Sequence, residues 1–231
     1  MMEKVVVLTG AGISAESGLK TFRDSGGLWE KYDINDVATP EAWDRNQKLV
    51  LEFYNARRKQ AIEALPNPGH LALVELEEKY NVTIITQNID NLHEKAGSSN
   101  VVHIHGEIMK AQSSINPEFV YPLDDWKLNI GQKCEAGSQL RPNVVWFGEP
   151  VPMMIQASEI TTKADILIVI GTSLNVYPAA GLIDVAKAEI PKYLIDPQEL
   201  NIIGINNLTH IKKKASKGVP QLADMLLREY N

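Results

Sequence analysis

The chain has 231 residues, of which 44% are hydrophobic and 23% are charged, as is ordinary for a folded globular protein. It carries 23 Lys and Arg against 29 Asp and Glu, which gives a formal net charge of −6. This acidic balance argues against a nucleic-acid-binding protein, because such proteins usually present a basic stripe.

Cys134 is the only cysteine, so neither an intrachain disulfide nor a four-cysteine zinc site can form. The first residues lack the apolar run of a signal peptide, and no stretch approaches the ~20 apolar residues of a membrane span. We therefore expect a cytoplasmic protein with neither membrane nor nucleic-acid partners and no bound metal.

Apolar, β-branched runs alternate with helical patterns along the chain. Runs of this kind predict strands buried on both faces: KVVVLTG from Lys4, NVTIITQN from Asn81, ADILIVIGTS from Ala164 and KYLIDP from Lys192. Helices are predicted for NQKLVLEFYNARRKQAIEAL, GHLALVELEEKY and VPQLADMLLREY, the last with Pro220 in its first turn and Leu222, Leu226 and Leu227 facing inward. The alternation predicts an α/β fold with a Rossmann-like, doubly wound parallel sheet.

Two segments interrupt this alternation, at about 21–65 and 110–140. The second has prolines, glycines and isolated aromatic residues with little periodicity. We interpret both as insertions that form a smaller module. The Rossmann-like core then comprises about 1–20, 66–109 and 141–231, within a single domain.

A glycine-rich turn follows the first predicted strand. Gly10, Gly12 and Ala15 form the pattern G-x-G-x-x-A, which brings backbone N–H groups close to a pyrophosphate at a helix start. An ordinary tight turn between a strand and a helix is an equally open alternative. Because the acidic ribose-binding residue of dehydrogenases is not evident about 20 positions later, a standard dehydrogenase is not expected.

Polar residues also follow two other predicted strands. Gln87, Asn88 and Asp90 lie beyond the second strand, and a GTS triplet from Gly171 follows the third. The carboxyl ends of parallel strands face the ligand crevice, where amide, carboxylate and hydroxyl groups can orient a ligand. The alternative in each case is a helix cap, formed by Asn88 or Asp90 and by Ser173.

The sequence VVHIHGE contains two histidines that a strand would place on one face. Without a third ligand nearby, a metal pair is not favoured. His105 is predicted to be a general base, because the pKa of histidine lies near working pH. A structural role stays open for His103, and the remaining three histidines are predicted to be structural or exposed: His70, His93 and His210.

The run RPNVVWFGE from Arg141 contains a short apolar, strand-like stretch before Gly148. An exposed stretch of this type can accept an extended peptide as an added strand. A buried core strand is the alternative.

Taken in order, these motifs closely resemble the sirtuin family, and its bacterial members most. The matching stretches are TGAGISAESGLKTFR, TQNIDNLHEKAG, HIHGE, RPNVVWFGE, GTSLNVYPAAG and ASKGVP, which run from Thr9 to Pro220. The resemblance implies a single NAD-dependent protein-lysine deacylase domain that acts on acylated lysine side chains of proteins or peptides.

The resemblance also implies roles for particular residues. The catalytic residues would be His105 and Asn88. The cofactor NAD would contact, from the glycine turn and the loop that follows it, Gly10, Ala11, Gly12, Ile13, Glu16, Thr21, Phe22, Arg23 and Trp29. Further NAD contacts would come from Gln87, Asn88, Ile89, Asp90, His105, Gly171, Thr172, Ser173, Leu194, Ile195, Asp196 and Ala215. The peptide-binding strand would consist of Val145, Trp146, Phe147, Gly148 and Glu149.

Tyr54 and Arg57 form a Y-x-x-R pair, which shares one face of the long predicted helix. In the sirtuin subclass that removes acidic acyl groups, such a pair binds the substrate carboxylate, and Arg does so through charge-assisted hydrogen bonds. Ser25 lies where that subclass often has a small residue. The alternative is a solvated helix face with Tyr54 at the core margin.

The chain departs from the family pattern at two places. Most sirtuins carry four zinc-binding cysteines after the His-Gly-Glu motif, whereas this stretch contains Cys134 alone, with Ser113 and Ser114 near the expected first pair. No zinc is therefore expected. Near the adenine ribose, Leu194, Ile195 or Asp196 replaces the usual asparagine.

The implied products are nicotinamide, free lysine and O-acyl-ADP-ribose, with acetyl, succinyl or malonyl as the acyl group. Two alternatives stay open: a protein ADP-ribosyltransferase, and a non-catalytic module that binds NAD or ADP-ribose. The presence of His105, Asn88 and Asp90 argues against the non-catalytic module.

Overall fold

The computed structural model describes residues 2–19, 32–172, 174, 177–199 and 204–229. Its main feature is a six-stranded sheet with the strand order β3-β2-β1-β7-β8-β9. The strands span Lys4–Thr9 (β1), Asn81–Thr86 (β2), Val101–His103 (β3), Ile166–Ile170 (β7), Lys192–Ile195 (β8) and Leu208–Ile211 (β9). All neighbours are parallel, so the predicted doubly wound α/β fold is confirmed.

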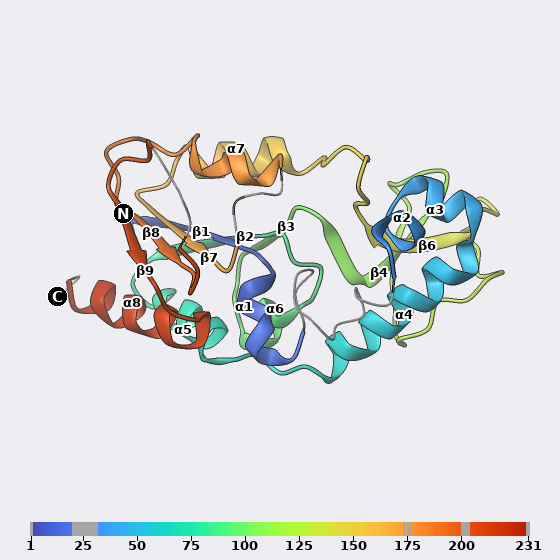
Figure 1. Ribbon diagram of the computed structural model, residues 1–231, viewed down its shortest axis with the longest axis horizontal. Helices are drawn as coiled ribbons and strands as arrows, with labels where there is room; N and C mark the ends of the chain where they lie inside the picture. The colour runs from blue at the N-terminus through green and yellow to red at the C-terminus, as the bar shows by residue number, and fades with distance from the viewer. Residues whose placement is uncertain (1, 20–31, 173, 175–176, 200–203, 230–231) are drawn as a thin grey trace.

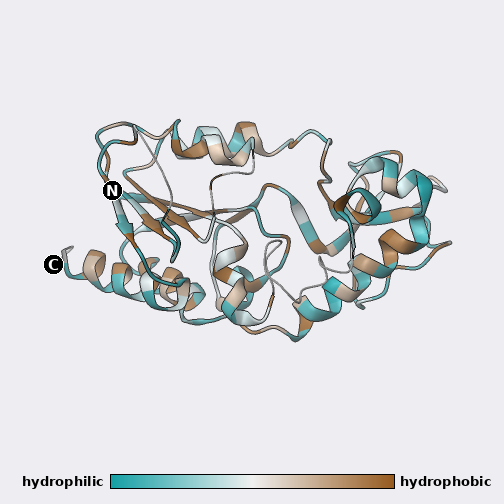
Figure 2. Ribbon diagram, in the orientation of Figure 1, coloured by the Kyte–Doolittle hydropathy of each residue, from teal (hydrophilic) through white to brown (hydrophobic). Residues whose placement is uncertain are grey.

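Helices cover both faces of this sheet (Figure 1). Those on one face are α5 (Pro68–Leu76) and α8 (Ala215–Glu229), whereas α7 (Met154–Thr161) and the 3-10 helix η3 (Ala179–Ile183) lie on the other. Side chains alternate between the two layers, as they do in any strand: Val5 and Val7 pack toward α5 and α8, and Val6 and Leu8 pack toward α7. Figure 2 shows the resulting apolar strands between the helices of the two layers.

Short helices follow the carboxyl ends of β1 and β2. The turn after β1 leads into α1 (Ala11–Ser14) and the 3-10 helix η1 (Ala15–Ser17), and α6 (Leu92–Ala96) follows β2. Among the helices that the structure describes, none is both long enough and apolar enough to cross a bilayer.

A separate small module lies at one end of the molecule (Figure 1). It combines α2 (Ile34–Val37), α3 (Pro40–Arg45) and α4 (Gln47–Glu63) with an antiparallel sheet of order β5-β4-β6. The strands of that sheet are β4 (Gly106–Ser113), β5 (Val120–Pro122) and β6 (Leu140–Val144). Trp43, Phe53, Ile108 and Trp146 contribute to its own apolar core.

The sequence specifies where several helices begin. Thr39 accepts a hydrogen bond from the Ala42 N–H and is followed by a proline at the first helical position of α3. Asn46 accepts from the Leu49 N–H to start α4, and Asn67 accepts from the Gly69 N–H to start α5. Each of these side chains satisfies a backbone donor that the helix itself leaves unpaired.

A buried arginine connects the elements of the small module. Arg58 has 0% exposure; its Nε donates to the Ile108 carbonyl at 2.6 Å, and its Nη1 donates to Asn55 Oδ1 and the Trp126 carbonyl, both at 2.8 Å. Asn55 in turn bonds both the N–H and the carbonyl of Leu128. The helix face at Arg58 is therefore not the solvated surface considered as an alternative.

The last helix starts earlier than predicted. It begins at Ala215, so Pro220 lies inside α8 rather than in its first turn. The Ser216 N–H and hydroxyl both donate to the Glu16 carboxylate, at 3.0 and 2.8 Å, and this tertiary contact defines the start of the helix. As predicted, Leu222 and Leu226 are buried.

Candidate active site

The turns after β1 and β7 pack backbone against backbone at the centre of the sheet. The Gly12 N–H donates to the Gly171 carbonyl at 2.8 Å, and the Gly10 N–H donates to the Ile170 carbonyl at 3.0 Å. A Cβ on Gly12 would lie 2.6 Å from Gly171 Cα, and Gly171 itself has φ of +60°. Only glycines allow this contact, which lies where the strand order reverses and where ligands bind in such sheets.

Three buried side chains form a connected group beside the first of these turns. Asn88 Nδ2 donates to the Gly10 carbonyl and to Ser14 Oγ, both at 3.1 Å, and the Ser14 hydroxyl donates to Asp90 Oδ2 at 3.1 Å. Burial raises the pKa of Asp90, and its hydrogen-bond donors and nearby cations oppose that shift.

Neither Asn88 nor Asp90 is the N-cap of α6, which is Asn91, although Asp90 does bind the first N–H of that helix; Ser173 lies outside the described residues. Asp90 Oδ1 accepts from the Leu92 N–H at 3.1 Å, at the start of α6, whereas the Asn88 side chain turns toward the glycine turn instead. Asp90 therefore both belongs to the polar group and binds the first N–H of α6.

The Gln87 side chain links the second and third polar stretches. Its Nε2 donates to the hydroxyl of the buried Thr172 at 3.3 Å. The Gln87 N–H continues the pairing of β2 with β1 by donating to the Thr9 carbonyl. The residues after β2 and after β7 thus meet above the sheet, as their positions at strand ends predicted.

His105 lies in the turn between β3 and β4, because β3 ends at His103. The expectation that one strand presents both histidines is therefore wrong. His105 Nδ1 lies 3.0 Å from the Gln87 carbonyl, which can only accept, so Nδ1 carries the proton and Nε2 has a free lone pair. Burial lowers the pKa of His105, against the effect of the Gln87 bond, which favours the neutral ring required of a general base.

His103 is bound at both ring nitrogens. Nδ1 lies 3.0 Å from the Asn88 carbonyl and Nε2 lies 2.7 Å from Glu94 Oε1. Both nitrogens face acceptors, so neither lone pair is available to a metal. Within the described ranges, no cluster of three His, Cys, Asp or Glu could hold a metal ion.

Tyr54 and Arg57 extend the group of side chains toward the small module. Tyr54 is only 2% exposed, and burial raises its pKa to about 12, although Arg57 and Trp146 oppose this shift. Burial also lowers the pKa of Arg57, while Tyr54 and Asp90 raise it. Arg57 is therefore within electrostatic reach of both Tyr54 and Asp90.

The segment after β6 is a fixed turn rather than a free edge strand. Arg141 Nη1 and Nη2 bind the two oxygens of Glu149 at 2.7 and 2.8 Å, and Glu149 Oε2 accepts from the Trp146 N–H. The Arg141 guanidinium also lies 3.7 Å above the Trp146 ring. The N–H groups of Val145 and Phe147 donate to other carbonyls of the protein.

Exposure within this segment differs from residue to residue. Trp146 is buried in the small-module core, whereas Phe147 is 50% exposed and Gly148 lies at the surface. The segment is therefore neither a simple core strand nor a fully exposed one.

Comparisons with known proteins agree on one family. The model of the Sir2 family matches residues 10–178. The NAD-dependent protein deacylase of Bacteroides thetaiotaomicron is 52% identical to this chain, over 98% of the chain and 99% of the relative.

The chain belongs to the Sir2 family.

Solved Sir2 structures share the whole fold. A Sir2 homologue in complex with NAD is 35% identical, with a TM-score of 0.88 over 100% of this chain and 91% of the other. A Sir2 protein with a deacetylated p53 peptide and 3'-O-acetyl ADP ribose is 31% identical, with a TM-score of 0.77 over 99% and 94% of the two chains.

Several residues implied by the Sir2 resemblance have mainly structural contacts in this chain. Glu16 binds Ser216, and the neighbouring Ala215 is buried. Leu194 and Ile195 are buried in opposite layers of the sheet.

Other implied residues lie at the edges of the site. Ala11 is exposed at the start of α1, whereas Ile13 is buried and its N–H donates to the Gly10 carbonyl. The Ile89 carbonyl accepts from the Ile108 N–H of β4. Asp196 follows β8, where its Oδ1 accepts from the Gln198 N–H. Six implied residues lie outside the described part of the chain: Thr21, Phe22, Arg23, Ser25, Trp29 and Ser173.

Sequence analysis missed Ser14 and Arg141 as members of the site. Ser14 lies within the quoted glycine motif, but only the fold shows that its hydroxyl connects Asn88 with Asp90. Arg141 belongs to the RPNVVWFGE stretch, and its spacing of eight residues from Glu149 does not by itself predict an ion pair.

His70, His93 and His210 have structural positions. His70 and His93 are fully buried with their ring centroids 5.0 Å apart, and His93 Nε2 lies 3.0 Å from the Thr9 hydroxyl. His210 Nε2 lies 3.0 Å from the Asp196 carbonyl, which joins β9 to the end of β8.

The donor set near the expected zinc position does not fit zinc. Cys134 Sγ lies 3.1 Å from Ser138 Oγ, which lies 2.7 Å from Ser113 Oγ. One thiol with two neutral hydroxyls cannot supply the four thiolate or imidazole ligands of a structural zinc site. The three side chains form a small hydrogen-bonded cluster instead.

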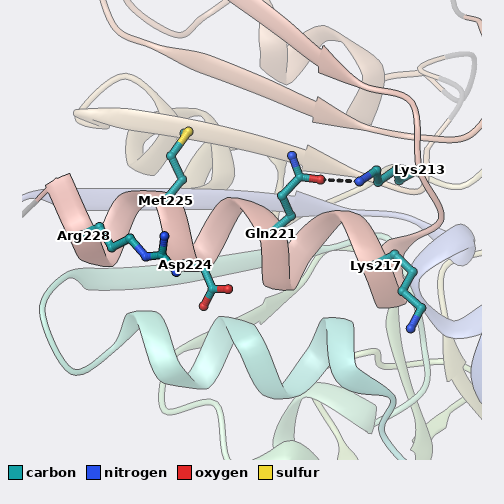
Figure 3. Close-up of a pocket in the computed structure, with 6 residues that line it drawn as sticks. All are labelled: Lys213, Lys217, Gln221, Asp224, Met225 and Arg228. Atoms are coloured by element: carbon teal, nitrogen blue, oxygen red, sulfur yellow. Dashed lines mark hydrogen bonds between the residues drawn. The ribbon is translucent and has the colours of Figure 1, made fainter.

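A shallow surface hollow lies along α8, away from these residues (Figure 3). In Figure 3, the Lys213 ammonium bonds Gln221, whereas Asp224 and Met225 point in different directions. None of its lining residues belongs to the site described above.

Proposed function

We propose that this protein is an NAD-dependent protein deacylase that acts on acylated lysine side chains. The observation that carries this proposal is a hydrogen-bonded group of Gly10, Asn88, Ser14 and Asp90 at the glycine turn, with Arg57 within electrostatic reach of both Asp90 and Tyr54, and with His105 bound to the Gln87 carbonyl. The names of its relatives, and the NAD and peptide complexes of similar structures, support the same activity.

NAD is the co-substrate in this proposal, and it supplies the ribose that receives the acyl group. We place its phosphates near Ala11, Gly12 and Ile13, and its adenosine near Gly171 and Thr172. Gln87 and Asn88 would then contact the nicotinamide ribose, and Asp90 the nicotinamide amide.

His105 would act as the general base. After the acyl oxygen bonds to C1′ and nicotinamide departs, Nε2 of His105 takes a proton from a ribose hydroxyl, which attacks the acyl-derived carbon. The proton on Nδ1 stays with the Gln87 carbonyl and holds the ring in the tautomer that this step requires. The lysine amine then leaves that carbon and one water adds to it, so the products would be nicotinamide, free lysine and O-acyl-ADP-ribose.

The side chains of Tyr54 and Arg57 would receive an acidic acyl group, such as succinyl or malonyl. Because its pKa is raised to about 12, Tyr54 keeps its hydroxyl proton at neutral pH and can donate it. Arg57 stays charged, because a guanidinium does not lose its proton in proteins. A cation and a neutral donor together suit a carboxylate.

The peptide chain of the substrate would lie along residues 145–149. We also propose that the chain works as a single catalytic domain, with the core and small-module boundaries stated above. A cytoplasmic location would agree with its single cysteine.

Incubation with NAD and an acetylated, succinylated or malonylated peptide tests the function. A deacylase releases one nicotinamide for each acyl group removed, measured by chromatography and peptide mass. His105→Ala should lower turnover by ~10²–10⁴-fold, the usual effect of losing a general base.

Two other outcomes would contradict the proposal. A peptide that gains the mass of an ADP-ribosyl group would identify a transferase. Binding of NAD without release of nicotinamide, for every acyl group, would identify a non-catalytic module.

A further inference from the structure

Two histidine side chains hold consecutive carbonyl groups of the loop after β2. The last backbone bond between β2 and β3 runs from the Ile104 N–H to the Thr86 carbonyl at 3.0 Å. Beyond it, His105 Nδ1 binds the Gln87 carbonyl and His103 Nδ1 binds the Asn88 carbonyl, each at 3.0 Å. The imidazoles therefore continue the pairing where the backbones separate.

The two rings differ in their second nitrogen. His105 keeps Nε2 free for proton transfer, whereas His103 Nε2 lies 2.7 Å from Glu94 Oε1. A carbonyl and a carboxylate can only accept, so His103 donates from both nitrogens and is an imidazolium. With its side chain 7% exposed and both nitrogens occupied, it has no atom left to act on a substrate.

The Asn88 carbonyl controls the orientation of two polar side chains. It belongs to the peptide that joins Asn88 to Ile89, and Asp90 follows directly. Rotation of this peptide would pull Asn88 away from Gly10 and Ser14, and Asp90 away from Ser14.

We propose that His103, held by Glu94, is a positioning residue for the deacylase reaction. It fixes the Asn88 carbonyl, and through it the Asn88 and Asp90 side chains at the nicotinamide ribose. This inference rests on the function proposed above and assigns a residue that does not itself touch either substrate.

Charged groups from three directions surround His103. Glu94 of α6 is hydrogen-bonded to it, and Glu107 of β4 and Asp90 of the loop lie within electrostatic reach. Lys110 in turn lowers the pKa of Glu94 through its positive charge. His93 lies in the same surroundings, with its pKa well below the ordinary value because of burial.

The balance of these effects favours the charged ring. Burial lowers the pKa of His103, but Glu94, the Asn88 carbonyl and Glu107 together raise it above its ordinary value. Both hydrogen bonds of His103 are therefore present together below that raised pKa, and one of them is lost as pH rises through it.

Two substitutions of His103 separate its two contacts. In His103→Asn, the amide nitrogen occupies the place of Nδ1 and can still donate to the Asn88 carbonyl. In His103→Gln, the longer amide reaches the place of Nε2 and donates to Glu94 instead. The two variants have the same polarity, so each is the control for the other.

We expect His103→Gln to lower kcat about tenfold or more, the usual effect of one charge-assisted hydrogen bond, while KM for NAD changes by less than about threefold. His103→Asn should keep most of the kcat. Three results would overturn the proposal. The two variants could lose kcat equally, His103→Gln could lose none, or the loss of kcat could be explained by a matching fall in the melting temperature of the variant.

Glu94→Gln gives a test that does not require activity. Imidazole resonances of the five histidines, followed by NMR against pH, should show His103 protonated at both nitrogens in the wild type and titrating at lower pH in the variant. Glu78→Gln, at an exposed glutamate elsewhere, should leave this titration unchanged. A neutral His103 in the wild type at pH 7 would refute the double contact.

Failure of the proposed function gives a different result. If the wild type releases no nicotinamide with any acylated peptide, the deacylase function is wrong, and so is the catalytic purpose assigned to His103. If the wild type is active but His103→Gln is as fast, only the positioning role is wrong.

Discussion

Burial sets the protonation state of the side chains around the site. Tyr54 keeps its proton because its pKa is raised to about 12, and His105 favours the neutral form because burial lowers its pKa. Arg57 is a cation held between Asp90 and Tyr54. Each side chain thus has, at neutral pH, the form that its proposed role requires.

Replacement of Arg57 should affect acidic substrates selectively. Arg57→Met removes the cation that would bind a succinyl or malonyl carboxylate, which is worth roughly 1.5–3 kcal/mol, or about 10–150-fold in kcat/KM. An acetyl group has no carboxylate for Arg57 to bind, so kcat/KM for the acetylated peptide should change little in this variant. Kinetics on matched acetyl and succinyl peptides measure the difference.

Arg45→Met is the matched control, because Arg45 is an exposed arginine that pairs with Asp36 on the outside of the small module. It should leave both activities unchanged. Equal losses on both peptides in Arg57→Met would contradict the assignment to acidic acyl groups.

His70 should make the protein sensitive to acid. It is fully buried, and burial lowers its pKa to about 4 from the ordinary 6.5. The unfolded chain therefore binds a proton that the folded chain rejects, so stability is complete above pH 6.5 and is lost as pH falls toward 4. The contribution is about 3 kcal/mol over this window.

Urea unfolding of the wild type and of His70→Gln, each at pH 7.5 and 4.5, measures this contribution. Between the two pH values, the free energy of unfolding of the variant should fall by about 2–3 kcal/mol less than that of the wild type. The same loss in both proteins would show that other groups cause the acid sensitivity.

At the scale of elements, α6 connects three parts of the molecule within five residues. His93 contacts Thr9 at the end of β1, and Glu94 binds His103 at the end of β3. Lys95 Nζ donates to three carbonyls at the end of α4, those of Ala61, Ile62 and Ala64, at 2.8–3.0 Å.

Loss of the Lys95 ammonium should loosen the helix that carries Tyr54 and Arg57. A cation near the last turn complements the helix dipole and satisfies carbonyls that lack a partner, so Lys95→Met should cost about 1 kcal/mol. Lys48→Met, near the start of α4, is the control and should cost much less. Urea denaturation of both variants measures the two losses of unfolding free energy. Equal losses would contradict this role of Lys95.

Sequence patterns predicted the central strands well, because continuous apolar runs have few structures other than buried strands. They missed β9, whose four residues LTHI show no period-two pattern, and α7, whose apolar face is short. They placed the start of α8 too late, since the contact between Glu16 and Ser216 spans 200 residues. They also treated His103 and His105 as strand neighbours, because the end of β3 depends on its partner β2.

The site was predictable to the extent that its residues follow strand ends. The positions of Asn88 and Thr172 follow from that rule. The bridging role of Ser14 and the complete burial of Arg58 do not, because both depend on groups contributed by distant segments.

At the scale of the whole molecule, the small module has no metal ligand set in its described part. Its elements are joined by the Arg58 and Asn55 network and by the cluster of Cys134, Ser113 and Ser138. These contacts, with the apolar core around Trp43, occupy the role that a zinc ion has in proteins with four cysteines.

We therefore expect no stoichiometric zinc in the purified protein. Elemental analysis should find well under one zinc per chain, and a chelator should change neither the melting temperature nor the activity, because one thiol cannot form a closed site. Arg58→Met is the complementary variant and should lower the melting temperature. One zinc per chain, or unfolding by the chelator, would contradict this view.

The central position of β1 has a consequence for synthesis on the ribosome. β1 pairs with β2 on one side and with β7 on the other, and the Lys4 N–H binds the carboxylate of Asp165, 161 residues later. At about 5–20 residues per second, the second edge of β1 waits roughly ten to thirty seconds for its neighbour. During that time an apolar strand has an unpaired edge, which is a template for aggregation. The backbone contact between Gly12 and Gly171 forms later still. A nascent chain that stops before β7 therefore cannot complete the glycine turn after β1, and a prematurely terminated chain is inactive.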